Sequence, residues 1–143
     1  MRVAAITALA RLEDSEAARF TMAGLRDSDP RVRAAAARGI AWFGDVSSGP
    51  ILIARLEEEE DDVAAAALLD ALGELRETRA VPVMIAMARG VSGVFQRHAA
   101  GVRVAAVRAV GAIGGDDARA LLLEVLNSKT PEVRDAAARA LGR

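Results

Sequence analysis

A regular spacing of apolar residues sets the strongest limit on how this chain can fold. One family of apolar positions recurs at intervals of 31, 32, 38 and 31 residues and comprises Leu9, Ile40, Leu72, Val110 and Leu141. A second family falls between its members and comprises Leu25, Leu56, Met87 and Leu126. Because self-similarity at a period of about 20–50 residues is the sequence signature of a repeat architecture, we expect a row of similar units instead of one globular core.

Each unit is expected to hold two short amphipathic helices joined by a turn. In the turn at 27–29, Asp29 can accept hydrogen bonds from the first free N–H groups of the next helix, and Pro30 suits its first position. On similar grounds we predict side-chain caps for four other helices, at Asp14, Ser48, Thr78 and Asp116. Such helices bury their apolar stripes only against neighbouring helices, so the units must stack.

The segments that open the second helix of a unit share a turn, a Val-Arg pair and an alanine-rich helix. They are Asp27-Ser28-Asp29-Pro30-Arg31-Val32-Arg33, Val102-Arg103-Val104-Ala105-Ala106 and Thr130-Pro131-Glu132-Val133-Arg134-Asp135-Ala136-Ala137. This order resembles HEAT-like repeats, specifically the short kind named after phycobilisome lyases, over nearly all of the chain. The resemblance implies an all-α protein, a right-handed α-solenoid of about nine helices in a single domain over 1–143. We place the repeat units at about 1–14, 15–45, 46–77, 78–115 and 116–143.

An arginine recurs at the start of the second helices, at Arg2, Arg33, Arg103 and Arg134. The resemblance implies that this arginine bonds the turn carboxylates and carbonyls of adjacent repeats, and Asp27 and Asp29 are the expected partners here. The third unit has Ala65 at this position, and the fifth has Asn127 in place of Asp27. We therefore expect an interrupted ladder with a structural role.

The resemblance also implies that the second helices line a concave surface. Helical periodicity places one set of residues on the exposed side of these helices, near the middle of that surface. The set is Arg38, Trp42, Asp70, Glu74 and Arg108. Exposed Trp and Arg are residue types that anchor protein interfaces, so we predict a recognition patch here. The alternative is that Trp42 packs against a neighbouring helix.

Two other segments depart from the repeat. The longest interval, 38 residues, reflects an insertion at about 90–101 that contains three glycines and the only histidine. Because loops often carry function, Phe95, Arg97 and His98 form a second recognition hypothesis, with a packing extension as the alternative. The acidic run at 57–62 is expected to be a solvated turn, since neighbouring carboxylates without turn glycines do not define calcium geometry. A site for a cation or for a basic partner is the alternative.

The composition narrows the chemistry that the chain can perform. There is no cysteine and His98 is the only histidine, so we predict no metal site, no catalytic residue and no cofactor. The net charge of −1 argues against a dedicated nucleic-acid binder. Because no run approaches the length of a membrane span and no signal peptide is evident, we expect a cytoplasmic protein that does not enter a membrane.

The favoured function is a non-catalytic scaffold that binds a protein partner on the concave face. The resemblance keeps open an accessory role in attaching or removing a phycobilin chromophore. In that case the chain would be an accessory subunit of a lyase. A HEAT-like DNA-binding protein is a less favoured alternative. Terminal repeats normally need a polar outer face, and neither end of this sequence has one, so self-association through the terminal helices is also possible.

Overall fold

The computed structural model describes residues 1–12, 15–92, 96–97 and 99–142. In this part of the chain there are nine α-helices, α1 (Arg2–Leu9), α2 (Ser15–Gly24), α3 (Pro30–Phe43), α4 (Gly49–Glu58), α5 (Asp62–Glu74), α6 (Val81–Arg89), α7 (Ala100–Ile113), α8 (Asp116–Val125) and α9 (Pro131–Ala140). Single 3₁₀ turns, η1 (Val46–Ser48) and η2 (Thr78–Ala80), precede α4 and α6. The predicted all-α solenoid is confirmed, whereas the exact bounds of the five units stay a prediction.

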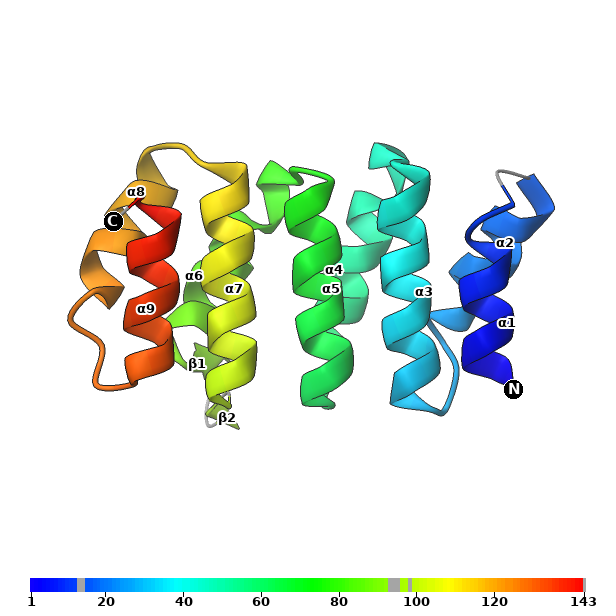
Figure 1. Ribbon diagram of the computed structural model, residues 1–143, viewed down its shortest axis with the longest axis horizontal. Helices are drawn as coiled ribbons and strands as arrows, with labels where there is room; N and C mark the ends of the chain where they lie inside the picture. Colours follow the sequence, from blue (N-terminus) through cyan, green and yellow to red (C-terminus); the bar gives the residue numbers. More distant parts are fainter. Residues whose placement is uncertain (13–14, 93–95, 98, 143) are drawn as a thin grey trace.

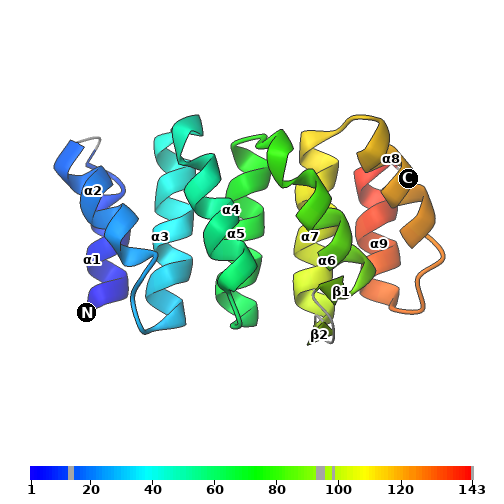
Figure 2. The same cartoon turned by 180° about the vertical axis from the view of Figure 1, so that it is seen from behind.

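The helices form two layers. The second helices of the units, α1, α3, α5, α7 and α9, lie side by side in chain order and form what we call the second-helix layer (Figure 1). The helices α2, α4, α6 and α8 form the first-helix layer behind them (Figure 2). The chain ends lie at opposite ends of the row. Among the described residues, no helix combines the length and the apolar character that crossing a membrane requires.

A continuous apolar core fills the space between the two layers. Leu52, Leu68, Leu72, Met84 and Leu121 are fully buried in it. Small residues let the second helices approach closely, most of all where α5 meets α7. A Cβ atom built on Gly73 would lie 2.9 Å from the Cα of Ala109, closer than such atoms pack. The backbones of these two helices are therefore in contact at this point.

The structure can be compared with the helix caps predicted for α3, α4 and α6. Asp29 caps α3 as predicted, because its side chain accepts from the backbone N–H of Arg31. Ser48 is the N-cap residue of α4 as predicted but makes no side-chain cap hydrogen bond, whereas Thr78 is the first residue of η2 and not the cap of α6. The residues whose side chains cap these turns are acidic and precede η1 and η2. These are Asp45, which accepts from the N–H of Ser47, and Glu77, which accepts from the N–H of Arg79.

The other two predicted caps have separate outcomes. Asp116 is not a cap, because α8 already begins at this residue and its N-cap is Gly115, whose φ of 95° lies in the left-handed region. Asp116 instead adds negative charge to the first turn of α8, where the helix dipole favours it. Asp14 lies outside the described residues.

The prediction of a solvated turn at 57–62 is wrong for one residue. Glu59 follows α4, and its side chain is only 1 % exposed. It is held by Arg33 from the preceding unit, as described below. The neighbouring Asp61 caps α5 by accepting from the N–H groups of Val63 and Ala64. The acidic run is thus partly a structural element.

The insertion includes a short antiparallel ribbon, which the all-α prediction did not include. Gly90 ends α6 with a φ of 87°, and the chain then forms β1 (Val91–Ser92) and β2 (Gln96–Arg97). Val91 pairs with Arg97, and Ser92 pairs with Gln96. Phe95 and His98 of the loop hypothesis lie outside the described residues, and only the backbone of Arg97 is described. The loop hypothesis stays a prediction.

Candidate functional site

Trp42 is the most prominent side chain of the predicted recognition patch. It lies one residue before the end of α3, and 71 % of it is exposed. This exposure contradicts the alternative that Trp42 packs against a neighbouring helix. Keeping so large an apolar ring in water is unfavourable in isolation, so an exposed Trp is a strong marker of a binding surface.

Trp42 borders an opening between α1 and α3 that we call the Trp42 cleft. The cleft has a volume of about 370 Å³, and its lining includes Val3, Thr7, Arg11, Arg38 and Trp42. Its base is formed where Gly39 approaches α1, since a Cβ on Gly39 would lie 2.9 Å from that of Ala10. Arg38 is exposed, and no ion pair involves it among the described residues. The cleft therefore combines an aromatic anchor with an available cation.

The other half of the predicted patch is closed by an ion pair. In the second-helix layer, Arg108 of α7 donates from Nη2 to both carboxylate oxygens of Asp70 of α5, at 2.6 and 2.8 Å. Glu74 joins them around a shallow opening of about 320 Å³ between the two helices. Because Arg108 and Asp70 neutralise each other, this half offers less charge to a partner than its sequence suggests.

The arginines at the start of the second helices are engaged in the turns. Arg2 donates from Nη1 to both carboxylate oxygens of Asp27, at 2.8 and 2.9 Å. Arg33 donates to the backbone carbonyl of Asp27 and pairs through two 2.7 Å hydrogen bonds with the Glu59 carboxylate. Arg33 thus bonds Asp27 through the backbone carbonyl of that residue, and its carboxylate partner is Glu59 of the next turn instead of Asp27 or Asp29.

The C-terminal arginines also bond the turns, but without a carboxylate. Arg103 donates to the carbonyl of Ala88, to Thr130 Oγ1 and to Ser128 Oγ, while Arg134 donates to the carbonyl of Ser128. Arg103 thus links its own turn to the next one, whereas Arg134 bonds only the turn that precedes its own helix, α9.

Asp29 serves its own turn in a similar way. A side-chain hydrogen bond from Arg31, followed by the backbone N–H of Arg31, lowers the pKa of Asp29 to about 2. The Arg31 guanidinium lies 2.8 Å from the carboxylate. Asp29 is therefore an ionised helix cap across the physiological range.

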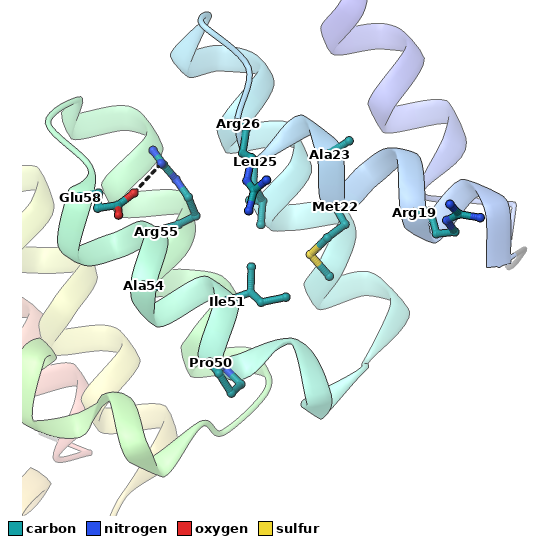
Figure 3. Close-up of a pocket in the computed structure, with 10 residues that line it drawn as sticks. All are labelled: Arg19, Met22, Ala23, Leu25, Arg26, Pro50, Ile51, Ala54, Arg55 and Glu58. Atoms are coloured by element: carbon teal, nitrogen blue, oxygen red, sulfur yellow. Dashed lines mark hydrogen bonds and ion pairs between the residues drawn. The ribbon is translucent and has the colours of Figure 1, made fainter.

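A further opening lies on the other layer and was missed by the sequence analysis. A cavity of about 650 Å³ separates α2 from α4, and its lining residues are drawn in Figure 3. The signal that could have found it was the pair Arg19 and Arg26, which lie seven residues apart and flank the apolar residues Met22 and Leu25. Elsewhere, no group of three His, Cys, Asp or Glu side chains is arranged to hold a metal ion in the described part of the chain.

The family model for HEAT repeats matches residues 1–73 and 91–143. The chain belongs to the HEAT repeat family. The match leaves out residues 74–90 and resumes at the ribbon of the insertion. No curated protein sequence matches this HEAT-repeat chain.

Two solved structures are similar to this HEAT-repeat chain. The first is the complex of CpcE and CpcF of phycocyanin lyase from Nostoc sp. PCC7120, with 28 % identity and a TM-score of 0.79 over 98 % of this chain. This chain spans only 57 % of the length of that relative. The second is human deoxyhypusine hydroxylase in complex with glycerol, with 17 % identity and a TM-score of 0.43, covering 99 % of this chain and 78 % of that one.

Proposed function

We propose that this HEAT-repeat chain is a protein-binding subunit that docks a partner polypeptide in the Trp42 cleft. The observation that carries the proposal is the exposure of Trp42, 71 %, beside an open cleft and the exposed Arg38. In this mechanism the stacked helices hold both side chains in place before the partner arrives. Preorganised anchors lose little conformational entropy on binding, which favours affinity.

The two anchors have different tasks. The Trp42 ring supplies apolar contact area, and the Arg38 guanidinium can donate to a carboxylate or to backbone carbonyls of the partner. Arg108 is a secondary contact in this proposal, because a partner must compete with Asp70 for it. The partner segment would run from the Trp42 cleft across the second-helix layer toward α7.

A first experiment tests the cleft by capture and affinity measurement. Trp42→Ala should abolish capture of the partner from a cell lysate and weaken the purified complex by about 30-fold, the effect of losing a hot-spot side chain worth about 2 kcal/mol. Trp42 is exposed, so the variant should remain folded. Arg139→Glu, an exposed change on α9, is the control. Equal capture by Trp42→Ala and the wild type would contradict the proposal.

A second candidate function rests on the similarity to the complex of CpcE and CpcF. We infer from the 28 % identity over 98 % of this chain that a role as an accessory subunit in phycobilin attachment deserves a direct test. In this role the chain would act together with a second subunit. The pairing of two proteins in the similar structure supports this idea.

Trp42 makes that role measurable, because it is the only Trp in the sequence. If a bilin binds beside Trp42, titration with phycocyanobilin should quench the tryptophan fluorescence with a saturable curve. Free tryptophan titrated in parallel corrects for absorption of the exciting light by the pigment. A corrected signal that stays constant would argue against a bilin site in the cleft and leave the protein-docking proposal in place.

A further inference from the structure

The cavity between α2 and α4 forms an apolar groove in the first-helix layer. In Figure 3, Met22 from α2 and Ile51 from α4 point toward each other across it. Leu25 forms part of the wall and is buried, whereas Ile51 is 47 % exposed. The groove therefore presents apolar side chains that no part of the described chain covers.

A second opening extends this groove over the outer side of α2. It has a volume of about 420 Å³ and is lined by Glu16, Arg19, Phe20 and Ala23. Arg19 and Ala23 line both cavities, so the two openings are adjacent. Phe20 is 61 % exposed here. Two large exposed apolar residues, Phe20 and Ile51, thus border one surface, and contiguous patches of this kind mark interaction sites.

Three arginines, Arg19, Arg26 and Arg55, and two glutamates, Glu16 and Glu58, lie around the groove and the second opening. Arg19 of α2 and Arg26, in the turn after α2, line it, are exposed, and form no ion pair with any described residue. Arg55 of α4 lines it too, and this arginine is paired with Glu58 at 2.9 Å. The whole chain carries a net charge of −1. A local excess of unpaired guanidinium groups on an otherwise balanced protein favours a negatively charged ligand.

We propose that this groove binds an amphipathic helix of a partner protein whose apolar stripe is flanked by Asp and Glu residues. The two walls, α2 and α4, have 10 residues each, which corresponds to about 15 Å at 1.5 Å per residue. This length matches nearly three turns of a docked helix. Apolar anchors at i, i+3 or i+4, and i+7 fill such a groove, and flanking carboxylates face Arg19 and Arg26.

This site is separate from the Trp42 cleft, since α2 and α4 lie in the first-helix layer whereas Trp42 lies in the second-helix layer (Figures 1 and 2). The two proposals can therefore fail independently. Loss of the groove ligand in a variant that still binds the Trp42 partner, or the reverse, would assign each ligand to its own face.

The test uses a displayed library of 14-residue peptides selected on the wild-type protein. We expect enriched peptides with apolar residues at helical spacing and an excess of Asp and Glu. Their affinity, measured by fluorescence anisotropy, should fall at least about tenfold in Arg19→Glu/Arg26→Glu, because like charges then face each other. Arg119→Glu/Arg139→Glu carries the same charge change at exposed positions on α8 and α9 and should bind as the wild type does.

Several outcomes would overturn the proposal. Enriched peptides without acidic residues, or acidic peptides that bind the groove variant as tightly as the wild type, would show that the arginines do not select the ligand. Sedimentation velocity tests whether a second copy of the chain occupies the groove. A dimer that forms with the wild type but not with Arg19→Glu/Arg26→Glu would assign the groove to self-association. If anionic lipid vesicles bind the wild type and the control variant but not Arg19→Glu/Arg26→Glu, the groove would be assigned to a membrane surface.

Discussion

Replacing Glu59 by alanine should lower the free energy of unfolding by about 3 kcal/mol, the lower end of the range for breaking a buried ion pair by removing one partner. The Glu59 side chain is 1 % exposed and the Arg33 side chain 14 %. Two hydrogen bonds of 2.7 Å join them, and the Glu59 carboxylate also accepts from the backbone N–H of Asp61 at 3.0 Å. Without Glu59, the Arg33 guanidinium keeps only backbone acceptors in a poorly solvated position.

Urea denaturation of the wild type and the variant measures this difference. Arg31→Ala is the control, because Arg31 also pairs with a carboxylate but on the exposed surface, where ion pairs contribute little. The control should change the denaturation midpoint far less than Glu59→Ala does. If both variants unfold at the same midpoint, the connection from Arg33 to Glu59 does not stabilise the stack of repeats.

The same pair predicts how stability depends on pH. Burial raises the pKa of Glu59, but hydrogen bonds from Arg33 and from the N–H of Asp61 outweigh it, and the pKa in the folded protein lies below the ordinary value of 4.5. A lowered pKa in the folded state means that the stabilisation is complete above the ordinary value and is lost as the pH falls through the folded value. The stability of Glu59→Gln should therefore fall less than that of the wild type on acidification below about pH 5.

The fold could be predicted because the residues that define the repeat, the apolar positions and the helix caps, act on the part of the chain that is close to them in sequence. Apolar spacing identified the helices, and Asp29 followed by Pro30 located the start of α3. The caps of α4 and α6 could not be read in this way, because Ser48 and Thr78 are also good capping residues. Asp45 caps η1 three residues before Ser48 and Glu77 caps η2 one residue before Thr78, and only the three-dimensional path of the turn distinguishes these choices.

The recognition patch was predictable only as a set of exposed positions. Helical periodicity placed Trp42 on the surface, where the structure has it. The same periodicity could not show that Arg108 and Asp70 are paired, because these residues are 38 positions apart and meet only through the packing of α5 on α7. The groove between α2 and α4 was missed for a related reason, since its two walls belong to different units.

Substituting Gly73 by valine should destabilise the protein by about 3 kcal/mol, the upper end of the usual cost of overpacking. A Cβ at this position would lie 2.9 Å from the Cα of Ala109 and 3.1 Å from its Cβ. The first of these atoms is backbone, so α7 as a whole has to move away from α5. That movement would loosen the contact between α7 and α5, the central helix of the second-helix layer.

Two other glycines make the prediction specific to helix packing. Gly101 lies in the first turn of α7 with no atom within 4 Å of an added Cβ, so Gly101→Val should leave the stability nearly unchanged. Gly111→Val should have an intermediate effect, because its Cβ would meet the Cβ of Ala140 at 2.8 Å and the terminal helix α9 can shift. Equal midpoints for the Gly73 and Gly101 variants in thermal denaturation would mean that the solenoid tolerates wider spacing of its second helices, and would remove close helix packing as the reason for glycine at this position.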